Sequence, residues 1–343
     1  SNKTFNQIGS DGGLFASPVT LPRLILAPGE RAEILIDFTG LGGQNINLLS
    51  YASELPNGIY GATNPAGMGP GTITGYSGNP LNGTNFNIIQ FQVNLSQTAN
   101  PVITIPSSLA LATPISPTLS EQSRTLTISP VVMGPSGSVN GPFQFNGAPF
   151  NMSINNYTVP LNNVETWVID NQSAIAHPFH IHDVQFYIID INGSAPPLNL
   201  QGRKDVVLVR AQQTVKFIAR FNDFCDSIPY MFHCHMLPHE DDGLMGQFVV
   251  SCPFTAIKEN NTSSNEFNVY PNPSQQFINV QLNDATNKII KIEFFDLLGK
   301  MIFENDLFEN KTQIPIGNIA NGAYLIKVYS HDKVLTRKLL INK

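Results

Sequence analysis

The chain has 343 residues and a formal net charge of −6 at pH 7, from 19 Lys and Arg residues against 25 Asp and Glu residues. This length allows two or three domains. No basic stripe indicates nucleic acid as a partner, and no run of about 18 apolar residues indicates a transmembrane helix. Gly, Pro, Asn, Ser and Thr are abundant and long helical patterns are missing, which predicts an all-β protein of short strands and many turns.

The charge is distributed unevenly along the chain. Residues 1–252 carry 9 basic and 16 acidic residues, whereas residues 253–343 carry 10 and 9. The C-terminal part is therefore a compositionally different unit. The chain begins at Ser1 without an initiator Met or a signal peptide, so we expect a processed or truncated sequence, in which a missing signal says nothing about export.

The first 95 residues are expected to form strands and loops. Residues 32–38 alternate in hydrophobicity after a Pro28-Gly29 turn, and residues 86–93 form another expected strand after a stretch rich in Gly, Asn and Pro at 56–84. These are too few strands to close a β-sandwich. We therefore interpret residues 1–95 as part of a domain whose N-terminal portion is missing.

A Pro-, Ser- and Thr-rich segment at 96–123 predicts a linker. Residues 124–254 then show strands at regular intervals, which is typical of a Greek-key β-sandwich. The expected strands of this domain are 143–145, 165–170, 180–190, 206–209, 215–221, 230–234 and 247–250. A polar linker at 255–266 leads to a small all-β unit at 267–343, whose expected strands include 278–282, 289–295, 324–329 and 334–341.

Six of the seven histidines lie between positions 177 and 239, in two clusters that bracket a cysteine. Imidazole and thiolate are ligands that copper and zinc prefer. The clusters are His177-Pro178-Phe179-His180-Ile181-His182 and His233-Cys234-His235-Met236-Leu237-Pro238-His239.

The spacing of these residues predicts two metal centres that share one strand. Alternate side chains of a strand point to opposite faces, so His233 and His235 point one way and Cys234 the other. His180 and His182 share a strand face as well, and the two pairs make one imidazole-rich group.

On the opposite face, Cys234 needs partners of its own. His239 follows across a turn and His177 precedes the other strand. Together they make the His₂Cys set of a blue-copper site. A structural zinc site is the alternative, but it would need four ligands and no shared strand. Ordinary core histidines would not cluster in this way while only His331 lies elsewhere.

With these residues the chain resembles the multicopper oxidases, the superfamily of laccases and bilirubin oxidases, over about residues 5–252. Both histidine clusters match the copper signatures of the C-terminal cupredoxin domain in that family. The segment Pro28-Gly29-Glu30-Arg31-Ala32-Glu33 resembles the middle domain, and Glu165-Thr166-Trp167 resembles the strand before the first cluster.

The resemblance implies a role for each ligand. His177, Cys234 and His239 would ligate type 1 copper, His180 type 2 copper, and His182, His233 and His235 the type 3 pair. Electrons from a small-molecule reductant would enter at type 1 through His239 or His177. They would pass through Cys234 to His233 and His235, and dioxygen would be reduced to water.

The sequence departs from the family pattern in its ligand count. The trinuclear cluster of the family takes eight histidines, four of them from an N-terminal domain that this sequence lacks. Only His331 is left over, so we expect no homo-oligomer to supply them. The chain alone is expected to bind at most type 1 copper well.

A second departure concerns the axial position of type 1 copper. The family register places Leu244 there, where many bacterial members carry Met, and Met245 is expected to face elsewhere; a shifted register with Met245 axial is the alternative. Third, members that oxidise cuprous ions carry Met and Asp where this chain has Ile175 and Ser173, together with a Met-rich insert. An organic, laccase-like reductant is therefore expected.

Three carboxylates lie close to the clusters in sequence. In the resembling family an acid after the last histidine helps deliver protons, which makes Glu240 a candidate proton relay. The alternative is a solvated acidic loop with Asp241 and Asp242. Asp183 and Asp205 are candidates to orient imidazoles, or ordinary loop and strand-edge acids.

Cys225 and Cys252 remain after Cys234 is assigned to metal. If residues 230–234 pair with 246–250 in a hairpin with Tyr230 opposite Gln247, the two cysteines lie opposite one another. A disulfide is then plausible and would imply an oxidising compartment. Two free, buried thiols are the alternative.

The C-terminal unit contains no ligand cluster. Its motifs, in order, are Tyr270-Pro271-Asn272-Pro273, Phe295-Asp296-Leu297-Leu298-Gly299-Lys300, Asn321-Gly322-Ala323-Tyr324 and a basic finish. They resemble the C-terminal sorting domain of type IX secretion cargo over nearly all of 267–343. That implies recognition by the secretion machinery, a secreted or cell-surface protein of a Gram-negative bacterium, and cleavage of the tail. An adhesion or carbohydrate-binding sandwich is the alternative.

The sequence as a whole predicts the C-terminal part of a secreted, laccase-like copper oxidase. A non-enzymatic blue-copper electron-transfer protein is the alternative, but it needs only His177, Cys234 and His239. A copper nitrite reductase is disfavoured because His233 and His235 both flank the cysteine.

Overall fold

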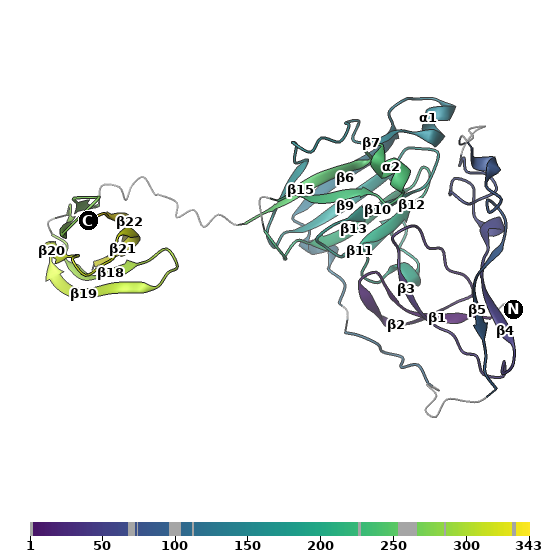
Figure 1. Ribbon diagram of the computed structural model, residues 1–343, viewed down its shortest axis with the longest axis horizontal. Coiled ribbons are helices and arrows are strands. Elements are labelled where there is room, and N and C mark those ends of the chain that lie inside the picture. Colours follow the sequence, from purple (N-terminus) through teal and green to yellow (C-terminus); the bar gives the residue numbers. More distant parts are fainter. Residues whose placement is uncertain are drawn as a thin grey trace. The chain divides into compact units, whose positions relative to one another are not determined.

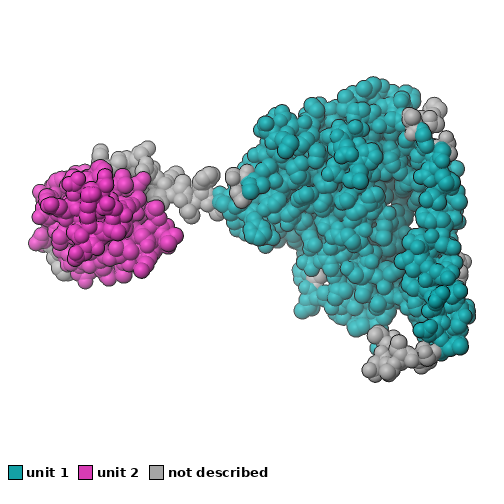
Figure 2. All heavy atoms as spheres, viewed as in Figure 1, with its two compact units in different colours: residues 1–253 teal, residues 254–343 magenta. Residues whose placement is uncertain are grey.

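The chain divides into two compact units, residues 1–253 and 254–343 (Figure 2). The structure is a computed structural model. It describes residues 3–67, 73, 75–95, 104–111, 113–225, 228–252, 266–284, 286–330 and 334–343. The predicted linker at 255–266, apart from its last residue, part of the predicted linker at 96–123, and His331 lie outside these ranges.

Two five-stranded sheets form a β-sandwich in the first unit (Figure 1). One sheet has the order β12-β10-β14-β15-β8 and the other the order β11-β13-β9-β6-β7. Neighbouring strands are antiparallel except in the pairs β6–β9 and β8–β15. The strands are β6 (Gln122–Pro130), β7 (Phe143–Phe145), β8 (Tyr157–Pro160), β9 (Val164–Asn171), β10 (His177–Ile181), β11 (Phe186–Ile191), β12 (Val206–Val209), β13 (Thr214–Arg220), β14 (Tyr230–Cys234) and β15 (Met245–Ser251).

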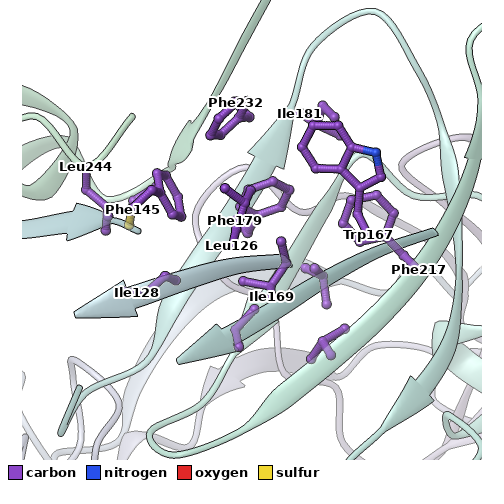
Figure 3. Packing of buried hydrophobic residues seen from close by; sticks show 14 of the residues in the cluster. Leu126, Ile128, Phe145, Trp167, Ile169, Phe179, Ile181, Phe217, Phe232 and Leu244 are labelled. Atoms are coloured by element: carbon purple, nitrogen blue, oxygen red, sulfur yellow. The ribbon is translucent and has the colours of Figure 1, made fainter. Parts of the chain in front are cut away.

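An aromatic core lies between these two sheets (Figure 3). Trp167, Phe217 and Phe232 are fully buried, and the Trp167 and Phe232 rings meet edge to face with centroids 5.7 Å apart. Full burial of each such side chain stabilises the fold by roughly 1.5–3 kcal/mol. The same cluster includes Cys234 and Leu244, so the predicted metal site adjoins the buried core of the unit.

Smaller sheets and turns precede the sandwich. Strands β1, β2 and β3 form one sheet in the order β2-β1-β3, and β4 pairs with β5. Their bounds are β1 (Phe5–Ser10), β2 (Gly13–Leu21), β3 (Ala32–Leu35), β4 (Asn45–Ser50) and β5 (Phe86–Gln92). The helices of the unit are α1 (Pro135–Asn140) and α2 (Leu237–Asp241), with 3₁₀ turns η1 (Ala52–Glu54), η2 (Tyr76–Gly78), η3 (Pro117–Leu119) and η4 (Leu198–Leu200).

Two predictions about the histidine strands were wrong. The strand expected over 180–190 is two strands, β10 and β11, which belong to different sheets. Asp183 lies between them with φ of +72°, a left-handed conformation that ends the first strand. His177 lies inside β10 rather than before it.

The hairpin of β14 and β15 has a different register from the predicted one. Tyr230 pairs with Phe248 rather than with Gln247. Cys225 and Cys252 nevertheless form a disulfide, with Cα atoms 5.0 Å apart. The one-residue shift does not prevent the disulfide, because both cysteines lie outside the strands and are not fixed by the ladder.

The second unit is a smaller two-sheet sandwich with its own core. The sheet orders are β16-β17-β20 and β19-β18-β21-β22. Buried side chains such as Phe267, Ile292 and Ile326 fill the space between them. Gly299, with φ of +81°, lies in the turn after Leu298. The strands are β16 (Phe267–Tyr270), β17 (Phe277–Leu282), β18 (Ile289–Phe295), β19 (Met301–Glu309), β20 (Lys311–Pro315), β21 (Gly322–Ser330) and β22 (Val334–Ile341).

Among the described residues, no helix has the length and apolar character needed to cross a bilayer.

Candidate metal centre

Cys234, His177 and His239 converge at the end of the sandwich where β10, β14 and α2 meet. The Cys234 Sγ atom lies 3.7 Å from Nδ1 of His177 and 3.7 Å from Nδ1 of His239, and the two Nδ1 atoms are 3.2 Å apart. All three side chains are buried, with at most 3% of their surface exposed. Two imidazoles and one thiol directed at a common point provide the donor set of a blue-copper site.

The other ring nitrogens of these histidines point away from the cysteine. Nε2 of His177 lies 2.9 Å from Oγ of Ser173, inside a buried network with Asn171. Nε2 of His239 lies 3.1 Å from the hydroxyl of Tyr60. Each imidazole is therefore held at its outer end, which fixes its orientation before any ion binds.

Burial keeps this group uncharged in the metal-free protein. It lowers the pKa of His177 well below its usual value and that of His239 to about 4, and it raises the pKa of the Cys234 thiol to about 12. Neutral imidazole is the form that binds a metal, and thiolate forms when a cation replaces the thiol proton. The group thus fits a cation that favours soft ligands.

Leu244 is part of the same centre. Its side chain is completely buried, with 0% of its surface accessible. Its backbone N–H donates to the carbonyl of His239 at 2.9 Å, and its carbonyl accepts from the N–H of Cys234 at 3.0 Å. Met245 begins β15 opposite His233 and is only partly buried.

His180, His182, His233 and His235 gather in a second group, as the sequence predicts. Ligand atoms of the first three lie within 4.8 Å of one another. Nε2 of His182 is 3.2 Å from Nε2 of His233, and the His235 ring lies 5.5 Å from that of His180. However, His182 and His235 each lie one residue beyond a strand, so chain turns as well as strand alternation bring these rings together.

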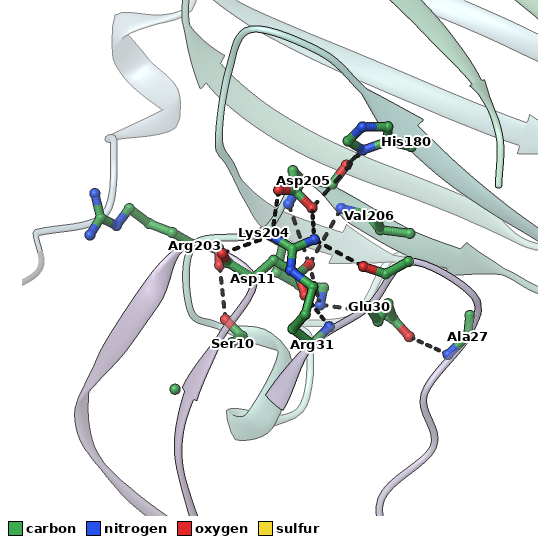
Figure 4. A network of polar contacts seen from close by, with 12 residues as sticks. Ser10, Asp11, Ala27, Glu30, Arg31, His180, Arg203, Lys204, Asp205 and Val206 are labelled. Carbon is green, nitrogen blue, oxygen red and sulfur yellow. Dashed lines mark hydrogen bonds and ion pairs between the residues drawn. The ribbon is translucent and has the colours of Figure 1, made fainter. Parts of the chain in front are cut away.

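A polar network from the N-terminal part of the unit supports this second group (Figure 4). Nδ1 of His180 lies 2.8 Å from the carbonyl oxygen of Asp205. Arg31 donates two hydrogen bonds to the Asp205 carboxylate, at 2.6 and 2.7 Å. Next to it, buried Lys204 pairs with Asp11 at 3.0 Å and with Glu30 at 3.1 Å. The backbone carbonyl of Asp205 therefore contacts His180, whereas its carboxylate, 4.0 Å from Nδ1, is held by Arg31. An imidazole-orienting role for the Asp205 carboxylate stays a prediction.

Gly29 in the same segment approaches the histidines directly. A Cβ atom at this position would lie 2.5 Å from Cδ2 of His235. The backbone at Gly29 thus packs against the imidazole and limits how that ring can turn.

Two acidic residues lie beside the histidine group. The Glu240 carboxylate on α2 lies 3.3 Å from Nδ1 of His233 and is partly exposed. This contact distinguishes it from a freely solvated loop acid. Asp183, next to His182, has a pKa raised to about 6, chiefly by burial.

Sequence reasoning missed three of the residues that hold these ligands. Tyr60 lies in an irregular loop far from the histidines in sequence, and nothing in the sequence marks it. Ser173 was considered only as the residue that stands where cuprous oxidases carry Asp. Arg31 was noted only as part of a family segment, and its partner Asp205 is 174 positions away.

Comparison with known proteins identifies the domains. The family model described as multicopper oxidase matches residues 122–253, the sandwich that contains both histidine groups. Residues 122–253 belong to the multicopper oxidase family. A second family model, the secretion system C-terminal sorting domain, matches residues 268–342. Copper is therefore the metal that the family of the oxidase domain implies, and the donor sets described above fit it.

Relatives of the oxidase domain extend the match towards the N-terminus. The chain is 28% identical to a multicopper oxidase of Staphylococcus haemolyticus, over 73% of this chain and 44% of that protein. It is 30% identical to a laccase of Bacillus stratosphericus, over 71% of this chain and 46% of that protein. The chain thus spans about half the length of the curated relatives that it matches.

Solved structures show the same relationship. A laccase-like multicopper oxidase of the lignin-degrading bacterium Ochrobactrum sp. superposes with a TM-score of 0.57 at 28% identity, covering 73% of this chain and 51% of that one. That protein has oxidase activity towards lignin model compounds and lignosulfonate.

Proposed function

We propose that this chain is the copper-binding part of a secreted, laccase-like oxidase. The oxidase would couple one-electron oxidations of an organic, phenolic reductant to the four-electron reduction of dioxygen to water. The observation that carries the proposal concerns Cys234 and its two chain neighbours. Cys234 belongs to a buried His₂Cys group, whereas His233 and His235 belong to a separate group of four histidines. An electron-transfer protein with only a blue-copper site has no use for the second group.

Each ligand has a proposed role. His177, Cys234 and His239 would hold type 1 copper beneath Leu244, His180 would hold type 2 copper, and His182, His233 and His235 would hold type 3 copper. Bound copper would supply one-electron redox chemistry at the first group and dioxygen binding at the second. Cys234 is covalently linked to both His233 and His235, so the chain itself provides a short path between the two groups.

The chain's own residues would do the remaining work. Ser173 and Tyr60 hold the outer nitrogens of the type 1 histidines, so these rings need not reorient when copper changes charge. Glu240 beside His233 would hold and pass on protons that dioxygen reduction consumes.

We propose an organic reductant rather than cuprous ion. No Met-rich run occurs in the sequence, and Ile175 and Ser173 stand where cuprous oxidases carry Met and Asp. The activity of the Ochrobactrum relative towards lignin model compounds supports the same class.

We further propose the domain organisation and the destination of the chain. Residues 1–95 would be part of a middle cupredoxin-like domain, 124–254 the copper domain and 267–343 the sorting domain, with linkers at 96–123 and 255–266. The sorting domain would direct the protein through type IX secretion to the cell surface or medium of a Gram-negative bacterium. The disulfide of the first unit suits an oxidising compartment.

The test of the proposed function is spectroscopic. Copper-loaded protein should show the intense blue absorption and the narrow electron-paramagnetic splitting of a type 1 site, and Cys234→Ser should lose both. A protein whose spectra show only ordinary copper–imidazole coordination, unchanged by Cys234→Ser, contradicts the assignment.

A further inference from the structure

An open cavity of about 550 Å³ is lined in part by Tyr60, whose hydroxyl contacts His239 of the Cys234 group. Its volume is within the size range of small-molecule sites. Its lining residues are Ser50, Ala52, Leu55, Tyr60, Gly61, Gly75, Tyr76, Asn79, Leu81, Asn82 and Phe86. None of these described residues is charged. Aromatic and aliphatic surface with a few hydroxyl and amide groups favours a neutral ring that carries a polar substituent.

The segment that lines the cavity is fixed against the metal centre. The backbone N–H of Ala176 donates to the carbonyl of Gly58 at 2.6 Å, directly before His177 in the chain. Gly67 N–H donates to the carbonyl of Ala174 at 2.7 Å. Ala62, two residues after Tyr60, is fully buried. Tyr60 is therefore held in place by the loop on both sides.

Among the described residues that line the cavity, Tyr60 is the one that contacts a type 1 histidine. His177 is completely buried and its Nε2 is enclosed by Ser173. His239 is 3% exposed, and its Nε2 meets the hydroxyl of Tyr60. Because Tyr60 also lines the cavity, a molecule bound there reaches His239 through the phenol ring of Tyr60.

The hydrogen-bond direction follows from the ligand geometry. Nδ1 of His239 faces Cys234 Sγ. When this nitrogen binds the metal, the neutral ring carries its proton on Nε2. Nε2–H then donates to the Tyr60 oxygen. The Tyr60 hydroxyl is left to donate its own hydrogen to an acceptor in the cavity, such as the oxygen of a bound phenol.

We propose that Tyr60 is the electron-entry residue of the oxidase. A neutral phenolic reductant would dock in this cavity and transfer its electron across Tyr60 and its hydrogen bond to His239, without touching the imidazole. The phenol O–H loses one electron and one proton and leaves as a phenoxyl radical. The electron would go to a cupric ion bound by His177, Cys234 and His239, and the proton would go to solvent water. This inference rests on the proposed function.

The first experiment separates binding from electron transfer with Tyr60→Phe. Anaerobic mixing of the copper-loaded chain with 2,6-dimethoxyphenol should bleach the blue absorption about tenfold more slowly in the variant, the factor that one lost hydrogen bond supplies. Calorimetry of the zinc-loaded proteins, in which redox-inert zinc takes no electron, gives the phenol concentration that saturates each of them. Bleaching rates are compared at saturation, so the lost hydrogen bond to the phenol does not slow bleaching through weaker binding. Equal bleaching rates in the variant and the wild type overturn the role of Tyr60.

The second experiment tests the cavity itself. Leu81→Trp should fill part of it and weaken phenol binding to the zinc-loaded protein about tenfold, with the blue absorption of the copper-loaded form unchanged. Leu111→Trp, in a separate cavity lined by Leu14, Tyr187 and Arg203, is the matched control and should change neither quantity. If Leu81→Trp binds phenol as the wild type does, the cavity is not the docking site. A wild-type protein that forms no blue absorption overturns the proposed function, and this inference with it.

Discussion

Leu244 is the residue that we propose for the axial position of the Cys234 centre. It is fully buried, and its backbone is bonded to the two residues that flank the proposed copper position. A thioether there adds a weak ligand, whereas a leucine leaves the reduction potential higher. Leu244→Met should therefore lower the reduction potential of type 1 copper, measured by redox titration of the blue absorption. Met245→Leu is the matched control and should leave it unchanged; the reverse pattern would favour Met245 as the axial residue.

Gly29 shows how backbone proximity shapes the second histidine group. Its φ is +86° and an added Cβ would meet His235, whereas Gly40 has φ of +78° and open space around it. Gly40→Ala should lower the free energy of unfolding by about 1 kcal/mol through backbone strain alone. Gly29→Ala should lower it by roughly a further 1–3 kcal/mol because of the clash. Urea denaturation of the metal-free proteins measures the difference, and equal losses would show that His235 moves aside freely.

At the scale of elements, Lys204 ties the N-terminal strands to the sandwich. It is 2% exposed and pairs with Asp11 after β1 and with Glu30 before β3. Removal of one partner from a buried ion pair leaves uncompensated charge. Lys204→Ala should therefore lower the free energy of unfolding by about 3 kcal/mol. Lys216→Ala removes a half-exposed pair with Asp190 and should lower it by less than about 1 kcal/mol in the same denaturation experiment.

The strands were predictable where buried and exposed residues alternate strongly. The turns between the strands were not. β9 was predicted within a residue at each end because its buried positions alternate around Trp167. The break at Asp183 was missed because its left-handed backbone depends on tertiary surroundings rather than on a glycine or proline signal. Both ligand groups were predicted from the spacing of the histidines around Cys234. Tyr60 did not, because a loop contact across 179 positions leaves no periodic trace.

At the scale of the whole molecule, the histidine inventory limits the metal content. Seven histidines are present in the chain, and the second group has four rings where the family's trinuclear cluster uses eight. The chain by itself should therefore retain about one tightly bound copper after dialysis, by elemental analysis, and should consume no dioxygen with a phenol. Retention of three or four copper ions with full dioxygen reduction would contradict this expectation.

The two units have separate cores, and this separation predicts how the tail behaves. No described residue of 254–343 belongs to either ligand group, so loss of this unit should leave the copper chemistry intact. Mass spectrometry of protein collected from the medium of a type IX-secreting host should find chains that end before Phe267, with the blue absorption of the full chain. As a control, residues 254–343 fused to an unrelated passenger should direct that passenger to the medium. A secreted protein that keeps residues 267–343 would instead favour an adhesion or carbohydrate-binding module, because a tail that serves only as an address has no further role after export.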